Sequence, residues 1–402
     1  MKLLLIAFAA FALAAPAQAG TGMYIGAAED AGKSADIVVS KAKMDLAVLA
    51  GFDAIRLTAI WQPGQTDLEG YELVALENAA AAANLNGIRV VLSVYHRGSR
   101  TTPLTADARG EFAQFAAALA TRLPTVRDFI VGNEPNLNMF WMPQFTRKGA
   151  SASPAAYFRL LAATYDALKA VSPDITVIGG SVSPRGQDKH RSSRQTHSPS
   201  RFISELGKAY RASRRKRPIM DEFAFHPYGE NSSVAPEFQR HPRSTSIGLS
   251  EYDRLVRLLG TAFDGTAQEG STLPIVYDEY GVDTAIPAVK RDAYRGREPK
   301  TTRPISEARQ SDYYRRALAM AYCQPTVKGF LVFHVSDEPD LDRWQSGLFY
   351  ADDTPKASLE PVRRAVEAVR GRTIARCKPN HRWAKAVQAA KRKPAKPGNS
   401  RR

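Results

Sequence analysis

The sequence predicts an α/β fold, a (β/α)8 TIM barrel, and three features of the chain indicate it. Apolar runs alternate with amphipathic helical patterns, which is typical of parallel sheets with crossover helices. Eight such units follow one another, and that number fits a closed barrel better than an open sheet. The turn at residues 26–32 also lacks the G-x-G-x-x-G spacing with which open sheets bind nucleotides.

The first four units occupy residues 22–171. A short apolar run between glycines predicts the first strand, and an apolar stripe with helical spacing predicts the helix behind it. The second strand follows Gly51, and Pro154 suits the first turn of the fourth helix. The predicted strands are 22–26, 53–58, 87–94 and 126–131, and the predicted helices are 41–49, 72–83, 106–122 and 154–171.

The last four units run to residue 369. The seventh and eighth strands, like the end of the fourth, are continuous apolar runs, as expected for parallel strands that are covered on both faces. The predicted strands are 174–179, 222–225, 273–277 and 329–333, and the predicted helices are 200–211, 251–263, 305–322 and 359–369.

The 402 residues, 44% of them hydrophobic, suffice for one large core and exclude a disordered chain. We expect a signal peptide at 1–19, a barrel domain at 20–375 and a basic, disordered tail at 376–402. An apolar run and the small residues Ala17 and Ala19 predict cleavage after Ala19, and hence a secreted or extracytoplasmic protein. A retained membrane anchor is the alternative, although the run is short for a span. We expect a monomer.

The two cysteines, Cys323 and Cys377, would meet an oxidising compartment after export, so we expect a disulfide between them. Two free buried thiols are the alternative, because the sequence does not show whether the two Cα atoms are close.

The net charge of +16 is concentrated near the C-terminus, where residues 372–402 hold eleven Lys or Arg and no acid. This tail predicts contact with an anionic component of the cell envelope, and a solvated tail without a partner is the alternative. A nucleic-acid partner is not expected, because the chain is exported and carries no nucleic-acid-binding motif.

Two apolar strands end in a glutamate, Glu134 and Glu279, and a charged residue is a poor end for a buried strand unless something there uses it. The C-terminal ends of barrel strands face the active site, so both carboxylates would reach one cavity. Glycoside hydrolysis needs such a pair. The other strand ends are also polar or aromatic, namely Arg56, Trp61, Tyr95, His96, Asn133, His226, Tyr228, His334 and Asp337.

The segment Asn133-Glu134-Pro135 after the fourth strand, with Glu279 after the seventh, resembles clan A of the glycoside hydrolases. Within this clan the chain is most similar to the cellulase family, family 5, and its neighbours. The match covers residues 22–369, and it includes Arg56, the His226-x-Tyr228 pair and the segment from Trp344 to Phe349.

The resemblance implies a retaining mechanism with Glu134 as acid/base and Glu279 as nucleophile. Glu134 would hold a proton, while Arg56 and Tyr228 would keep Glu279 ionised. Asn133 would bind the sugar 2-hydroxyl. Retention predicts a carboxyl separation of roughly 5–5.5 Å, against roughly 6.5–9.5 Å for inversion. No metal or organic cofactor is implied.

The remaining strand-end residues are expected to contact a carbohydrate substrate. Trp61, Trp141 and Trp344 are candidates for stacking on a pyranose, and we favour Trp344. His96, His226 and His334 are expected to bind sugar, because no H-x-H or H-E-x-x-H spacing supports a metal cluster. His334 stands where many relatives have a tryptophan.

The predicted loops after strands five and seven are basic, and they would lie on the catalytic rim. We therefore expect an anionic glycan, for example one with uronic acids, and the alternative is solvated charged loops. The cations are Arg185, Lys189, Arg191 and Arg194 in the first loop, and Lys290, Arg291, Arg295, Arg297, Lys300 and Arg303 in the second.

Each glutamate segment, taken singly, also fits a purely structural role. Asn133 to Pro135 could start a helix, with Asn as the cap and Pro in the first turn, and Glu279 could be a surface acid. At the level of function, the alternatives are a catalytically idle barrel that binds cell-surface glycan, and a transglycosylase in which an acceptor sugar replaces water.

Overall fold

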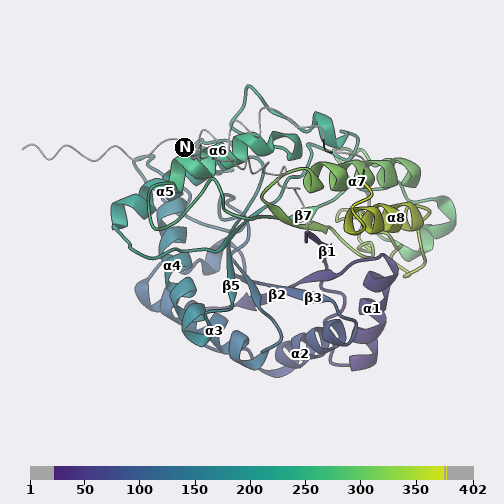
Figure 1. Ribbon diagram of the computed structural model, residues 1–402, viewed down its shortest axis with the longest axis horizontal. Helices are drawn as coiled ribbons and strands as arrows, with labels where there is room; N and C mark the ends of the chain where they lie inside the picture. The colour runs from purple at the N-terminus through teal and green to yellow at the C-terminus, as the bar shows by residue number, and fades with distance from the viewer. Residues whose placement is uncertain (1–21, 375–376, 378–402) are drawn as a thin grey trace, which may run out of the picture.

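The computed structural model of the protein describes residues 22–374 and Cys377. The predicted signal peptide and, apart from Cys377, the predicted tail lie outside these residues. Eight parallel strands pair in chain order and β8 pairs with β1, so the sheet is a closed barrel (Figure 1) and the predicted fold class is confirmed. The strands are β1 (Tyr24–Ala28), β2 (Ala54–Trp61), β3 (Arg89–His96), β4 (Asp128–Val131), β5 (Thr176–Val182), β6 (Glu222–Phe225), β7 (Ile275–Tyr280) and β8 (Val327–Val332).

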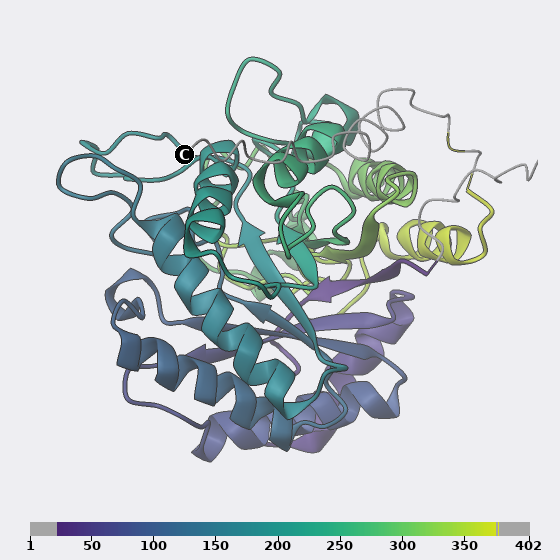
Figure 2. The ribbon, with the colours of Figure 1, turned by 60° about the vertical axis from the view of Figure 1, so that its left-hand side comes forward.

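Each strand is followed by a helix on the outside of the barrel, and the view turned by 60° (Figure 2) shows the strands running through the middle of the molecule. Side chains of Thr105, Ser198 and Ser306 cap three of the helices by accepting a first-turn N–H. No helix of the described residues is long and apolar enough for a membrane span. The helices are α1 (Ile37–Leu49), α2 (Gly70–Leu85), α3 (Ala106–Arg122), α4 (Ser153–Val171), α5 (Pro199–Ser213), α6 (Tyr252–Phe263), α7 (Glu307–Tyr322) and α8 (Leu359–Arg370).

The core has two parts, one between strands and helices and one inside the barrel. Each strand contributes one buried residue to the inner cluster, which consists of Tyr24, Ala54, Val91, Ile130, Ile178, Ala224, Val276 and Leu331. Two positions further along several strands, the inward side chain becomes polar, as at Arg56, Ser93, His226 and Asp278. Side chains alternate along a strand, so these polar groups form the next layer inside the barrel, directly above the apolar inner cluster.

All eight predicted units are present, and the differences concern their ends. The first strand starts two residues later than predicted, and β2 and β3 continue further, to Trp61 and His96. Eight residue pairs join β2 to β3. Pairing with a neighbouring strand decides how far a strand extends, and the sequence pattern of one strand alone does not contain that information.

Cys323 and Cys377 form a disulfide, with Cα atoms 5.4 Å apart and 54 positions between them in sequence. Cys323 directly follows α7, which packs beside α8. A Cys323→Ser variant is expected to lose about 2–5 kcal/mol of unfolding free energy, because the bridge restricts the unfolded chain. Urea unfolding measures this loss, and the reduced wild-type protein should have the same unfolding free energy as the variant. Equal stability of oxidised wild type and variant would contradict the expectation.

Candidate active site

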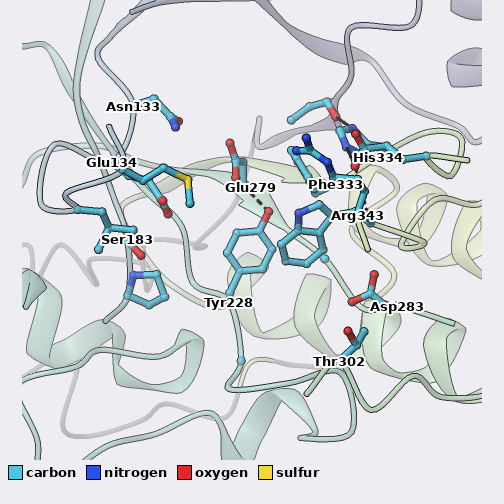
Figure 3. Close-up of a pocket in the computed structure, with 18 of the residues that line it drawn as sticks. Asn133, Glu134, Ser183, Tyr228, Glu279, Asp283, Thr302, Phe333, His334 and Arg343 are labelled. Atoms are coloured by element: carbon cyan, nitrogen blue, oxygen red, sulfur yellow. Dashed lines mark hydrogen bonds and ion pairs between the residues drawn. The ribbon is translucent and has the colours of Figure 1, made fainter. Parts of the chain in front are cut away.

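A cavity of about 740 Å³ opens at the C-terminal ends of the strands, and both glutamates line it. Figure 3 shows Glu134 on one side of this pocket and His334 on the other, with Glu279 and Tyr228 between them. Glu134 follows β4 and Glu279 lies in β7, and β5 and β6 separate these two strands in the barrel. The closed sheet therefore brings together residues that are far apart in sequence.

Glu279 is held by two donors. The Tyr228 hydroxyl donates to Oε2 at 3.0 Å, and the Arg56 guanidinium donates to Oε1. Arg56 also donates to Ser93 Oγ at 3.1 Å and to Asn133 Oδ1 at 3.0 Å, so one buried cation connects three strand ends. Burial disfavours the charge of Arg56, but the neighbouring charges of Glu279 and Asp278 outweigh burial and raise its pKa.

Glu134 follows a sharp turn at the end of β4. Gly132 and Glu134 both have positive φ, 87° and 39°, which turns the chain away from the strand direction. The Glu134 amide donates to the Ser181 carbonyl at 2.8 Å, and Glu134 Oε1 lies 3.0 Å from His226 Nδ1. Backbone and side chain of Glu134 are thus both fixed from neighbouring strand ends.

His226 is fully buried behind the two glutamates. Burial favours the neutral ring, but the charges of Asp278 and Glu279 and hydrogen bonds with Asp278 and Glu134 outweigh it and raise the pKa of His226 to about 10. Burial likewise acts to raise the pKa of Asp278, but His226, Arg56 and Ser181 lower it below its ordinary value. The floor of the site is therefore a network of ions.

Aromatic rings form one wall of the cavity. The Trp344 and Tyr228 rings are stacked, with centroids 4.9 Å apart and planes at 28°. Phe333 packs edge-on against Trp344 at 5.3 Å. Such a wall offers an apolar face beside polar groups, which is the combination that suits a sugar ring.

The structure brings most of the predicted site residues to this cavity. Its lining includes Arg56, Asn133, Glu134, Tyr228, Glu279, His334 and Trp344. His334 lines the edge next to β1, where its Nδ1 lies 2.6 Å from the Ala28 carbonyl oxygen.

Trp61, His96 and His226 do not line the cavity, so the structure gives no support for their expected sugar contacts. Trp61 is 0% exposed, packs on Phe112 of α3 and donates to the Gln65 carbonyl. His96 packs on Trp141, itself buried. Alternation explains both cases, because Tyr95 faces the pocket and its neighbour His96 therefore faces the helix layer.

Several residues of the site were not predicted. Asp278 lies beneath the cavity, and its position directly before Glu279 at the end of a buried strand was a usable signal. Leu137, Met139 and Phe140, which follow Glu134, give the cavity an apolar edge. No pattern in the sequence distinguished them from ordinary loop residues.

The basic loops contribute little positive charge to the cavity. Of their ten cations only Arg185 lines it. Lys290 pairs with Asp352 at 2.9 Å and Arg295 pairs with Asp340, both outside the lining. Eight carboxylate side chains line the cavity, namely Glu29, Asp30, Glu134, Glu230, Glu279, Asp283, Glu338 and Asp342, against the guanidinium groups of Arg56, Arg185 and Arg343.

No group of three or more His, Cys, Asp or Glu side chains within the described ranges could hold a metal ion. The contacts of the two glutamates are instead with Arg, Tyr and His side chains.

The loop that carries Met139 is fastened to the loop after β5 through His197. The His197 amide donates to the Asn136 carbonyl at 2.8 Å, and its ring nitrogens lie 2.8 Å from Gln144 Oε1 and 3.0 Å from Ser151 Oγ. Burial lowers the pKa of His197 to about 4. The buried ring is thus neutral at neutral pH.

This depressed pKa predicts an acid-sensitive stability. His197 takes up a proton more readily in the unfolded chain, so its stabilising contribution is present above about pH 6.5 and is lost as the pH falls towards 4. A His197→Gln variant, which cannot titrate, should show a shallower fall in unfolding free energy over this range. Parallel curves for variant and wild type would contradict the assignment.

No family model matches the sequence, and no curated protein matches it. Solved structures do match. A GH5_18 enzyme from Streptomyces cattleya in complex with Manb1-4GlcNAc is 16% identical with a TM-score of 0.58, covering 92% of this chain and 89% of that one. A monomeric β-xylosidase from Caulobacter crescentus is 18% identical with a TM-score of 0.51, covering 86% and 67%.

An exo-β-1,4-mannosidase from Opitutaceae bacterium strain TAV5 is 15% identical with a TM-score of 0.54, and this chain spans 60% of its length. These neighbours are glycoside hydrolases of the TIM-barrel type. At such identities the likeness shows the fold alone. The narrower resemblance to family 5 stays a prediction, because a GH39 enzyme from Xanthomonas axonopodis pv. citri, at 16% identity and a TM-score of 0.52, is also among the neighbours.

Proposed function

We propose that this chain is a glycoside hydrolase that acts with retention of configuration, with Glu134 as acid/base and Glu279 as nucleophile. One observation carries the proposal. A single nitrogen, His226 Nδ1, lies 3.0 Å from Glu134 Oε1 and 3.4 Å from Glu279 Oε2. These two oxygens are therefore no further apart than the sum of those distances, an upper limit that includes the roughly 5–5.5 Å of retaining enzymes and falls at the lower edge of the roughly 6.5–9.5 Å of inverting ones.

The contacts of each residue fit its proposed role. Glu134 donates its proton to the glycosidic oxygen while Glu279 attacks the anomeric carbon, so the bond to the leaving group breaks and a glycosyl ester forms. Glu134 then removes a proton from water, whose oxygen displaces Glu279. Arg56 and Tyr228 orient Glu279 and offset its negative charge in the free enzyme.

Asn133 and Trp344 are the proposed sugar contacts. Arg56 donates to Asn133 Oδ1, which fixes the amide beside Glu279 and leaves it suited to a hydroxyl of the sugar ring. Trp344 offers a ring face at the same cavity, stacked on Tyr228.

The charged side chains that line the cavity favour an uncharged sugar over an anionic one as the substrate. The basic loops that suggested an anionic glycan place only Arg185 in the lining, where carboxylates outnumber guanidinium groups. The carboxylate of a uronate would be repelled by these negatively charged side chains at close range. Neutral β-linked sugars are therefore proposed as the first substrates. The names of the neighbours favour neither choice, since they include a β-xylosidase and an exo-β-1,4-mannosidase but also a β-glucuronidase.

Aryl β-glycosides of glucose, mannose, xylose, galactose and glucuronic acid test the proposal directly. We expect turnover of at least one neutral member, and labelling of Glu279 by the matching 2-deoxy-2-fluoro glycoside, since this reagent traps the covalent intermediate of a retaining enzyme. Peptide mapping should find the label on Glu279, and a Glu279→Gln variant should stay unlabelled. If none of the glycosides were turned over, the proposed function would be wrong. Preference for the glucuronide would instead support the anionic glycan expected from the sequence.

A further inference from the structure

A second buried acid, Asp278, lies directly beneath the proposed catalytic pair and has no part in the reaction described above. Its side chain is fully buried. Asp278 Oδ2 accepts a hydrogen bond from Ser181 Oγ at 2.8 Å, lies 3.2 Å from His226 Nε2 and lies 3.8 Å from Arg56 Nε. Within the described structure Oδ1 has no hydrogen-bond partner. Burying a carboxylate in this way is costly, so the presence of Asp278 at this position calls for a role.

Irregular strand pairing explains how two consecutive acids reach the same site. Successive side chains of a strand normally point to opposite faces. Val276 and Asp278 face the barrel interior, so regular pairing would turn Glu279 outward. The register of β7 on β8 shifts between Tyr277 and Tyr280, where three steps on β7 match two on β8. This irregularity turns Glu279 inward as well, towards the cavity.

His226 connects Asp278 to both glutamates. Its Nε2 faces Asp278 Oδ2 and Ser181 Oγ, the latter at 2.9 Å, while its Nδ1 faces Glu134 and Glu279 at 3.0 and 3.4 Å. Ser181 already donates its proton to Asp278. Nε2 thus faces the ionised Asp278 and Nδ1 faces the ionised Glu279, and both of these acceptors are satisfied when both ring nitrogens carry a proton. The charged ring would then sit between the two catalytic carboxylates.

We propose that Asp278 is a positioning residue that keeps His226 doubly protonated, and that the charged ring holds the Glu134 and Glu279 carboxyl groups at the separation that retention requires. The kinetic part of this inference rests on the proposed glycosidase function. The raised pKa of His226, to about 10, agrees with the geometry. The charged or titratable groups that face the ring are Glu134 from the turn after β4, Asp278 and Glu279 from β7, and Tyr228, whose ring lies edge-on at 6.1 Å.

The first test needs no activity. In protein with 15N-labelled histidine, the His226 ring should remain doubly protonated at pH 8 in the wild type. In an Asp278→Asn variant, which keeps the shape but removes the charge, the ring should become neutral by that pH, because the free group titrates near 6.5. A His226→Gln variant assigns the signal. A neutral His226 in the wild type at pH 8, or the same titration in both proteins, would overturn the inference and leave the proposed function standing.

The second test separates positioning from stability. For Asp278→Asn we expect kcat/KM on alkyl glycosides to fall by up to about 10²-fold, the lower end of what proton transfer contributes. The loss on aryl glycosides with acidic phenols should be smaller, because their leaving groups need little help from Glu134. The alkaline limb of the pH profile should move to lower pH, since His226 loses its proton sooner. An unchanged pH profile, together with an equal loss of kcat/KM on alkyl and aryl glycosides, would contradict the positioning role of Asp278.

Asp128→Asn serves as the matched control. Asp128 is an equally buried aspartate at the other end of the barrel, where it pairs with Arg89. Its replacement should lower stability without moving the pH profile. If Asp278→Asn does not fold, Ser181→Ala gives a milder version of the same test, since it removes only the hydroxyl that orients Asp278. The same direction of shift is then expected, and its absence in a folded variant counts against the proposal.

Discussion

Glu279→Ala is expected to lose hydrolysis by at least about 10⁴-fold, because no glycosyl-enzyme can form without the nucleophile. Added azide should restore part of the rate, since the small anion fits the space left by the carboxylate and attacks the anomeric carbon directly. The product should be the glycosyl azide of inverted configuration. Rate measurement with and without azide, followed by NMR of the product, checks both statements.

Glu134→Ala should behave differently from Glu279→Ala. Loss of a general acid costs about 10²–10⁴-fold when the leaving group needs a proton, and much less when it is an acidic phenol. Azide should here give the product with the configuration of the substrate, because Glu279 still forms the covalent intermediate. If Glu134→Ala gave the inverted azide and Glu279→Ala the azide with the configuration of the substrate, the two roles would have to be exchanged. Full activity of either variant would contradict the two-glutamate mechanism.

Phe238→Ser is a suitable control for both variants. Phe238 is a large exposed side chain, 69% accessible, outside the cavity lining. Its replacement should leave the rate and the response to azide unchanged. A loss of activity that is seen in the glutamate variants alone can then be attributed to the removed carboxylate.

Lys356→Met is expected to destabilise the protein by about 3–5 kcal/mol, because it leaves the charge of a buried aspartate without its partner. Lys356 Nζ donates to Asp337 at 2.8 Å and to Thr284 at 2.7 Å, and neither Lys356 nor Asp337 has an exposed side chain. Burial lowers the pKa of Lys356 and raises that of Asp337 to about 6. Denaturant unfolding at pH 7 measures the effect.

Two further variants show whether the loss comes from the broken pair. In the Lys356→Met, Asp337→Asn double variant, no charge is left buried alone, so much of the stability should return. Lys41→Met removes an exposed i,i+4 partner of Asp45 and should cost only about 0.3–0.5 kcal/mol. A double variant less stable than Lys356→Met would show that the packing of Met, and not the unpaired charge, sets the cost.

The buried pair also matters for the cavity. Asp337 accepts hydrogen bonds from Tyr294 and from the Gly347 amide, and Lys356 Nζ donates to the Gln345 carbonyl. Gln345 and Gly347 follow Trp344 in sequence and Asp337 precedes Glu338, and both Trp344 and Glu338 line the pocket. We therefore expect Lys356→Met to raise KM for glycosides at temperatures at which the variant is still folded.

The order of the elements and the two glutamates could be predicted from the sequence. Both follow from local information, since an apolar run of limited length predicts a buried strand and a charge at its end is visible without any partner. Barrel closure then requires the ends of β4 and β7 to meet at one face, whatever the details of packing. For this reason Arg56, Asn133 and Tyr228 could also be assigned to the site.

In contrast, the direction and the contacts of each strand-end side chain emerged from the folded structure. Trp61 and His96 point into the helix layer because the paired part of β2 and β3 continues to these residues, where alternation along the strand turns both side chains outward. Glu279 turned inward because the register of β7 on β8 shifts. The state of His226 depends on Asp278 and Glu134, which lie 52 and 92 positions away in sequence. Charge and orientation at these positions arise from contacts between strands, and a single sequence does not record such contacts.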